Sequence, residues 1–349
     1  MGGRFELVDA VLCRMRISTV GRRHPLNEFD LIRDVFMSGG KTGSPQASKV
    51  CLGIGDDAAL LRPTPGRHLV TSVDTLVEGV HFLADVGPEK LGHKSLAVNL
   101  SDMAAMGAEP RWFLLALTLP EVDISWLRRF AAGMTGLARR HGVTLVGGDT
   151  CRGDVLSVGI TVLGEVPEGQ ALLRSGARPG DGIYVTGNLG DAAAGLQALK
   201  GRLRASSEDL AVLRNRLECP VPRVEVGTAL RGLASAAIDL SDGLAADLGH
   251  ILRAGGCGAH IRAAALPVSG VLVRNLGGKE ARALALNAGD DYELCFTLPA
   301  DRAPQMRSRF AGLNCPVTCI GEIEVEAGLT VLDDEGGVME IPAGFVHWE

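Results

Sequence analysis

The sequence predicts a two-domain protein of the α/β (α+β) class, and three observations support this. Its 349 residues are enough for two domains of ordinary size. Strand-like apolar runs alternate with helix-like segments along the chain, which favours two successive α/β units over one long doubly wound sheet. Glycine and proline gather at residues 167–180, where we expect the boundary between the domains. We therefore expect an N-terminal extension at 1–26, a first domain at 27–167 and a second domain at 168–349.

The first domain should begin with a helix and continue as alternating strands and helices. The clearest helix lies at residues 88–107, because Leu96, Leu100 and Met103 recur on one face at helical spacing. A later helix should end at the pair His141 and Gly142. The expected order is a helix at 28–37, a loop at 38–48, a strand at 69–77, the helix at 88–107, a strand at 112–119, a helix at 124–140, and strands at 143–146 and 156–166.

The second domain shows the same alternation of strands and helices. An apolar strand at 236–240 leads directly into a helix at 242–253, as in an α/β unit. The C-terminal tail at 317–341 should consist mainly of strands. The other expected elements are a strand at 182–186, helices at 190–199, 210–217 and 223–233, a strand at 292–298, and a helix at 302–310.

Composition and charge exclude several classes of function. The net charge is −6 and no run of lysine or arginine occurs, which argues against a nucleic-acid partner. The eight cysteines form no C-x-x-C pair, so we expect buried free thiols in a reducing cytosol. The first 20 residues lack the apolar core of a signal peptide, and the longest strongly apolar stretch, at 112–119, is too short to span a bilayer. We expect a cytoplasmic protein without a membrane partner.

Six segments place a carboxylate at the edge of an apolar element. Taken alone, each has an ordinary structural explanation: an aspartate beside glycine is usually a turn residue, and Ser241 or Asp242 could cap the following helix. The sequence does not supply a lysine or arginine beside each carboxylate. The segments lie at 55–57, 72–75, 99–102, 147–150, 239–243 and 289–293.

Together, the six segments indicate a site for divalent cations. A carboxylate at the end of a buried strand needs a partner, and one cation can satisfy several. Mg²⁺ prefers hard oxygen ligands and is commonly held by a few carboxylates together with substrate phosphates. The pattern therefore indicates phosphoryl transfer, in which positioning and charge neutralisation do most of the work. Glycine-rich turns at 147–150 and 187–191 could let backbone N–H groups approach a phosphate, although the second fits an ordinary strand-to-helix turn equally well.

Seven segments form a distinctive set of motifs. They are G-I-G-D-D-A-A-L-L at 53–61, V-D-T-L-V at 73–77 with H-F at 81–82, A-V-N-L-S-D at 97–102 with M-G-A at 106–108, G-G-D-T at 147–150, L-R-S-G-A at 173–177, I-D-L-S-D-G-L at 238–244 and D-Y-E-L-C-F at 291–296. In order and spacing, from about residue 27 to the C-terminus, they resemble those of the thiamine-monophosphate kinase family. The resemblance implies ATP-dependent phosphorylation of thiamine monophosphate to thiamine diphosphate. It also implies two α/β domains per chain: an N-terminal mixed sheet with helices that pairs across a homodimer, and a C-terminal sandwich-like α/β domain.

The resemblance also implies roles for individual residues. The Mg²⁺ ligands would be Asp57, Ser72, the Val73 carbonyl, Asp74, Asp102, Asp149, Asp239 and Asp242. ATP would be contacted by Gly148, Asp149, Arg174 and Ser241. The thiamine phosphate would be contacted by His81, Asp290 and Phe345. The chain departs from the family at two of these positions, because Asp290 stands where glutamate is frequent and Phe345 where tyrosine or tryptophan is common.

The mechanism implied is direct in-line transfer from ATP, assisted by several Mg²⁺ ions and without a phosphoenzyme. No acid–base residue is required, since the acceptor phosphate is already ionised near neutral pH. Two alternatives stay open at this point. One is another ATP-using enzyme of the same superfamily, like selenophosphate synthetase or aminoimidazole ribonucleotide synthetase. The other is a non-catalytic protein that binds Mg-nucleotide.

Overall fold

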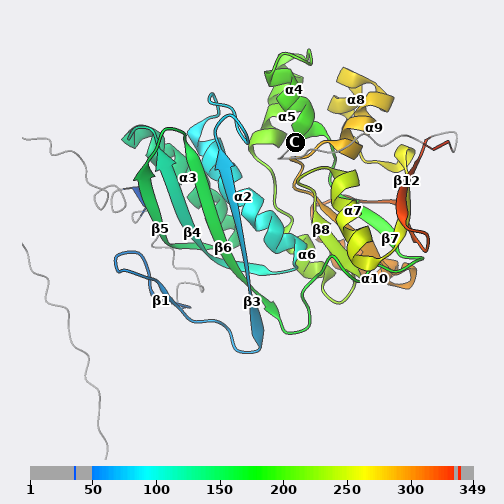
Figure 1. The fold of residues 1–349 in the computed structure, drawn as a ribbon, viewed down its shortest axis with the longest axis horizontal. Helices are drawn as coiled ribbons and strands as arrows, with labels where there is room; N and C mark the ends of the chain where they lie inside the picture. Colours follow the sequence, from blue (N-terminus) through cyan, green and yellow to red (C-terminus); the bar gives the residue numbers. More distant parts are fainter. Residues whose placement is uncertain (1–34, 37–48, 334–336, 339–349) are drawn as a thin grey trace, which may run out of the picture.

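The computed structural model describes residues 35–36, 49–333 and 337–338, and shows two β-sheets side by side with helix α2 between them (Figure 1). The expected helix at 28–37 and loop at 38–48 lie outside the described residues, apart from residues 35 and 36. The first sheet has the strand order β3-β6-β4-β5. Its elements are β3 (Arg67–Val77), α2 (Pro88–Ala105), β4 (Glu109–Leu119), α3 (Ile124–His141), β5 (Thr144–Arg152) and β6 (Ser157–Pro167), preceded by the small hairpin β1 (Val50–Leu52) and β2 (Leu60–Leu61).

The strand β3 shows how the first sheet presents its two faces. Alternate side chains of a strand point to opposite sides. Accordingly Leu76 is buried toward the helices, together with Ile160 and Leu115 on the neighbouring strands, whereas Leu69 and Val73 are 52 % and 64 % exposed. Helices α2 and α3 cover one face (Figure 1). The other face of the sheet therefore keeps large apolar side chains in contact with solvent.

Helices α2 and α3 pack closely because glycines stand at their contact. A methyl group at Gly92 would lie 2.0 Å from the Phe130 carbonyl oxygen, and one at Gly133 would lie 1.8 Å from the Glu89 carbonyl oxygen. Real carbon atoms do not approach backbone oxygen so closely. The position of α2, which carries several candidate site residues, thus depends on the absence of side chains at these two positions.

We expect Gly133→Ala to destabilise the protein by about 1–3 kcal/mol, because the new methyl group forces α3 away from α2. Gly136→Ala, one turn further along the same helix, is the matched control: no atom lies within 4 Å of its added carbon. That substitution should stabilise the protein by up to about 1 kcal/mol through helix propensity. Urea unfolding of both variants measures the difference, and equal stabilities would contradict the close packing.

The second sheet has the order β12-β9-β11-β7-β10-β8, and all its pairings are antiparallel except β9 with β12. Helices α4, α5, α8 and α9 form a group above this sheet in the view of Figure 1. The elements are β7 (Gly182–Thr186), α4 (Asp191–Leu199), α5 (Ser207–Glu218), α6 (Val224–Leu230), β8 (Ala236–Asp239), α7 (Leu244–Gly255), β9 (Gly258–Arg262), η4 (Ala263–Ala265), α8 (Gly270–Leu276), α9 (Gly278–Asn287), β10 (Leu294–Leu298), η5 (Ala300–Arg302), α10 (Ala303–Phe310), β11 (Val317–Glu324) and β12 (Gly328–Leu332).

One hydrophobic cluster spans both halves, and α6 contributes to the contact between them. A methyl group at Gly227 of α6 would lie 2.0 Å from the Ala104 carbonyl oxygen of α2, so these helices are in backbone contact. Arg231, just after α6, donates from Nη1 to Glu109 Oε1 at 3.0 Å. Apolar side chains from both halves belong to the same buried cluster. The contact between the halves places the end of α2 beside the second sheet.

The α/β (α+β) fold class expected from the sequence is confirmed, and most elements lie within a few residues of their expected bounds. Two expectations are wrong. Three of the cysteines, Cys51, Cys151 and Cys319, are exposed rather than buried. The glycine pair at 147–148 does not form a turn at a strand end but continues β5 to Arg152. Pairing with β4, across a register shift, holds the extended backbone there. Strand β9 and helices α8 and α9 had no counterpart in the expectations. Among the described helices, none has the length and apolar character that a membrane crossing needs.

Candidate active site

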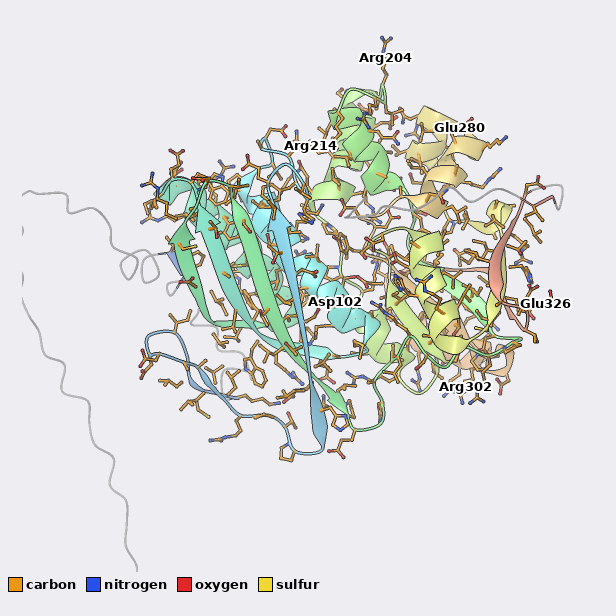
Figure 2. All side chains as sticks on the ribbon, in the orientation of Figure 1. Asp102, Arg204, Arg214, Glu280, Arg302 and Glu326 are labelled. Atoms are coloured by element: carbon orange, nitrogen blue, oxygen red, sulfur yellow. The ribbon has the colours of Figure 1, made fainter. Side chains whose placement is uncertain are left out.

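Three carboxylates from three different elements gather where α2 meets both sheets. Asp74 lies in β3, Asp102 near the end of α2, and Asp239 at the end of β8, and α2 packs against both strands. Asp102 lies near the middle of the molecule, between the two sheets (Figure 2). Within the part of the chain that the structure describes, no lysine or arginine lies within ion-pair distance of any of the three. None of the three carboxylates therefore has an ion-pair partner among the described residues.

The electrostatics of these carboxylates reflect their burial and their proximity. Burial, with the charge of Asp102 second, raises the pKa of Asp74 to about 6. Burial and then the same neighbour raise the pKa of Asp239 to about 7. Burial also raises the pKa of Asp102, although the Ser72 hydroxyl, which donates to Asp102 Oδ2, and the charge of Arg174 oppose the shift. The three carboxylates therefore disfavour one another's ionised forms.

Strand β3 supplies two of the candidate residues on one side and a third on the other. Ser72 and Asp74 point toward α2, and the Asp74 N–H donates to Asn99 Oδ1 at 3.2 Å. The side chain of Val73 points to the exposed face. This alternation explains why only a backbone atom of Val73 could take part in the site.

On the second sheet, a rigid loop follows β8 and carries Ser241 and Asp242. The N–H groups of Ser241, Asp242 and Gly243 all donate to Asp247 Oδ2, at 3.0, 3.0 and 3.2 Å. Helix α7 begins after Gly243 and has no side-chain N-cap, so neither Ser241 nor Asp242 caps it. A structural role as helix cap is thus excluded for the side chains of both residues.

The loop at 289–292 packs on this loop from the other side. The N–H of Asp290 donates to the Ser241 carbonyl oxygen at 2.9 Å, and the N–H of Tyr292 donates to the Leu240 carbonyl oxygen at 2.8 Å. Burial raises the pKa of Tyr292 well above its usual value, and the charges of Asp290, Asp74 and Asp239 add to the effect. The backbone hydrogen bonds hold the loop of Asp290 against the segment that follows Asp239.

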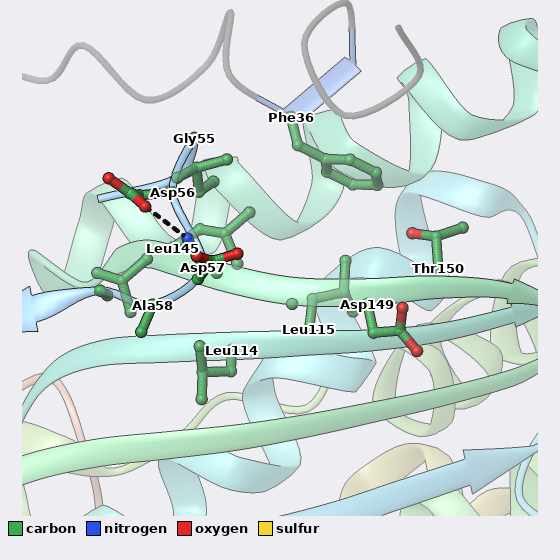
Figure 3. Close-up of a pocket in the computed structure, with 15 residues that line it drawn as sticks. Phe36, Gly55, Asp56, Asp57, Ala58, Leu114, Leu115, Leu145, Asp149 and Thr150 are labelled. Carbon is green, nitrogen blue, oxygen red and sulfur yellow. Dashed lines mark hydrogen bonds between the residues drawn. The ribbon is translucent and has the colours of Figure 1, made fainter. Parts of the chain in front are cut away.

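Asp57, Gly148 and Asp149 line a separate pocket of about 500 Å³ on the first sheet (Figure 3). Asp57 comes from the loop between β1 and β2, and its N–H donates to Asp56 Oδ1 at 2.9 Å. A methyl group at Gly148 would lie 2.0 Å from the Leu115 carbonyl oxygen, so only glycine fits there. No described contact joins this pocket to Asp74, Asp102 or Asp239.

His81 and Asp290 meet in a second, narrower cavity of about 40 Å³. His81 follows the end of β3, and its Nδ1 accepts from the Val77 N–H at 3.1 Å, so a neutral ring carries its proton on Nε2. Lys94 of α2 lies between the two residues, with Nζ at 3.3 Å from Asp290 Oδ1. Phe345, the third residue expected for the substrate, lies outside the described residues.

The site differs from the sequence expectation in three further respects. The N-terminus of α4 is not open to an anion, because the buried carboxylate of Asp291 already accepts from Gly190 N–H.

The residues that the sequence reasoning missed are Lys94 and Asp247. Lys94 stands among the buried residues of α2, and a lysine within an apolar stripe is the signal that could have found it. Among the described residues, no compact group of three or more His, Cys, Asp or Glu has the arrangement of a metal site.

The fold and its two pockets define a two-domain protein of the AIR synthase related class. The N-terminal domain of AIR synthase related proteins matches residues 55–166, and the C-terminal domain matches residues 178–334. A thiamine-monophosphate kinase of Salmonella typhimurium is 50 % identical over 298 residues, which cover 85 % of this chain and 91 % of the relative. The chain belongs to the thiamine-monophosphate kinase family.

Solved structures agree with this assignment. The crystal structure of thiamine-monophosphate kinase from Stenotrophomonas maltophilia K279a superposes with a TM-score of 0.78 at 47 % identity, covering 83 % of this chain and 92 % of that one. A second structure, AaThiL complexed with AMPPCP and TMP, has a TM-score of 0.73 at 32 % identity and covers 95 % of this chain and all of that one. The shared fold therefore extends over both sheets.

Proposed function

We propose that this protein transfers the γ-phosphoryl group of ATP to thiamine monophosphate and forms thiamine diphosphate. One observation carries the proposal: the loop with Asp290, which lines the cavity of His81, is hydrogen-bonded to the segment that directly follows Asp239 of the carboxylate group. Two anionic phosphates can meet beside such a group only when cations neutralise it. Relatives of up to 50 % identity that are named for this reaction support the choice of substrate.

The metal in this proposal is Mg²⁺, bound as several ions. Its ligands would be Asp57, Ser72, the Val73 carbonyl, Asp74, Asp102, Asp149, Asp239 and Asp242. The donor set fits the metal, since all these atoms are hard oxygens, and waters and phosphate oxygens would complete the coordination. When bound, the ions neutralise the phosphates and orient them for in-line transfer.

The remaining candidate residues bind and orient the substrates. Gly148 lines the pocket of Asp57 and Asp149 and would contact ATP through its backbone. Arg174 is exposed, its charge acts on Asp102, and its guanidinium is suited to phosphate. Asp149 and Ser241 complete the ATP contacts. His81, Asp290 and Phe345 hold the thiamine phosphate, the last through its aromatic ring. No residue needs to act as a general base.

The test is an assay of purified protein with ATP and thiamine monophosphate. We expect formation of thiamine diphosphate that requires Mg²⁺ or Mn²⁺, and EDTA should lower the rate on the order of 100-fold or more until metal is restored. Aminoimidazole precursors or selenide should not be consumed. Binding of Mg-ATP without any thiamine diphosphate would instead identify a non-catalytic nucleotide-binding protein. A chemically competent phosphoenzyme would overturn direct transfer.

We also propose that two chains pair through the exposed face of the first sheet. Leu69 and Val73 of β3 and Leu114 of β4 are large apolar residues on that face, and monomeric proteins rarely leave such a surface in water. Leu114 also lines the pocket of Asp57 and Asp149, so a second chain would lie beside that pocket. The domain limits at 27–167 and 168–349 and the cytoplasmic location stay predictions.

Light scattering after gel filtration should give twice the 36.5 kDa mass of one chain. Leu69→Arg should shift the protein to the single-chain mass, because a charge cannot be buried unpaired in an apolar interface. The matched control is Val325→Arg, an equally bulky change at a valine that is 77 % exposed on the second half of the chain. Dissociation of both variants, or of neither, would argue against this face.

A further inference from the structure

Lys94 is a buried cation that the proposed chemistry does not account for. Its side chain is 3 % exposed, and it stands on α2 among apolar residues. Burying an ammonium group is strongly unfavourable unless it is paired and hydrogen-bonded. Its partners are Asp290 Oδ1, at 3.3 Å from Nζ, and the His81 carbonyl oxygen, to which Nζ donates at 3.4 Å. The lysine therefore contacts both described residues of the expected substrate cavity.

These two partners come from segments that are far apart in the sequence. His81 belongs to the turn after β3, where the Gly79 N–H donates to the Phe82 carbonyl oxygen at 2.9 Å. Asp290 belongs to the loop before β10 and has a φ of 70°, in the left-handed region that non-glycine residues seldom adopt. Backbone strain of this kind persists only where surrounding contacts hold it. Lys94 supplies one such contact on Asp290.

The lining of the cavity also comes from segments that are far apart in the sequence. Its walls come from the turn after β3, from α2, from α4 and α5, and from the loop before β10. Among the lining residues, Lys94 is the one that α2 supplies. The Lys94–Asp290 pair is neutral as a whole, so this wall adds no net negative charge beside an anionic ligand.

We propose that Lys94 is a positioning residue for the acceptor substrate. It fixes the separation of His81 and Asp290 across the cavity and compensates the carboxylate charge that would otherwise face the substrate phosphate. This inference rests on the proposed function, since it concerns the same cavity. Lys94 acts through its two partners, and it takes no part in binding ATP or in transferring the phosphoryl group.

The experiment compares Lys94→Met with Lys49→Met in the full chain. Lys49 is the matched control, because it forms an ion pair with buried Glu165 at 3.0 Å but lines neither described pocket. We expect Lys94→Met to raise KM for thiamine monophosphate about 100-fold, the effect of misplacing a binding group by about 1 Å. KM for ATP should stay within about twofold of the unsubstituted value. Lys49→Met should lower the melting temperature and leave both constants unchanged.

A double substitution distinguishes positioning from an independent contact. If Lys94 acts through Asp290, adding Asp290→Asn to Lys94→Met should cause no further rise in KM for thiamine monophosphate. If the rises in KM for thiamine monophosphate of the two single variants multiply in the double variant, the proposal is overturned. If Lys94→Met does not fold, Lys94→Gln replaces it, since an amide can still donate to the His81 carbonyl oxygen while lacking the charge.

The two proposals can fail separately. An unsubstituted chain that does not consume thiamine monophosphate overturns the proposed function, whatever Lys94 does. An unsubstituted chain that is active, together with equal acceptor KM values for Lys94→Met and Lys49→Met, overturns the positioning role alone. A rise in KM for ATP equal to that for the acceptor would likewise overturn it, because a role confined to the acceptor cavity cannot produce it.

Discussion

Asp102→Asn will lower turnover on the order of 10³-fold while leaving the fold at least as stable as before. The amide cannot supply the negative charge that a shared Mg²⁺ needs, and the loss of one strong electrostatic contact in a transition state has an effect of this order. Stability should not fall, because burial already disfavours the ionised form of Asp102, and the charge of Asp102 raises the pKa of Asp74 and of Asp239. Removing that charge relieves repulsion when no metal is bound.

The measurements for this prediction are the initial rate with saturating Mg-ATP and the melting temperature without metal. Asp154→Asn is the control, because Asp154 is exposed in the loop after β5 and lines neither described pocket. It should leave both quantities unchanged. A variant at position 102 that keeps more than about a tenth of the activity would contradict the central place of Asp102 in the site.

Glu293→Ala will have the largest expected effect on stability. The carboxylate of Glu293 is 1 % exposed and accepts from Arg223 Nε and Nη2, both at 2.6 Å, from Arg216 Nη2 at 3.0 Å and from the Thr186 hydroxyl at 2.6 Å. These contacts join β7, α5, the start of α6 and β10. Breaking a buried ion pair by removing one partner typically destabilises by about 3–5 kcal/mol, because the remaining charge is left uncompensated.

Urea unfolding of Glu293→Ala measures this loss, and Glu293→Gln should be less affected because it keeps the shape and one acceptor. The control is Glu89→Ala, which removes another two-bond contact with an arginine, Arg129. That pair lies in water, where screening leaves little net stabilisation. Similar losses of unfolding free energy in the two alanine variants would show that burial does not decide how much Glu293 contributes to stability.

Local patterns predicted most of the elements but misjudged where backbone pairing overrides them. Gly147 and Gly148 looked like a turn because glycine favours turns in isolation, yet β4 pairs with them and carries β5 on to Arg152. Strand β9 is only five residues long and was missed for lack of a clear alternation. Helices α8 and α9 are short and are separated by Gly277, so neither shows a sustained helical period.

The sequence alone predicts the kind of ligand, because aspartates at the edges of apolar segments indicate cations and phosphates. Which aspartates meet could not be read in this way, because Asp74, Asp102 and Asp239 are brought together by the packing of α2 against two sheets. The same packing buries Lys94 between His81 and Asp290. Contacts between distant segments arise from the burial of apolar surface, which a local pattern does not encode.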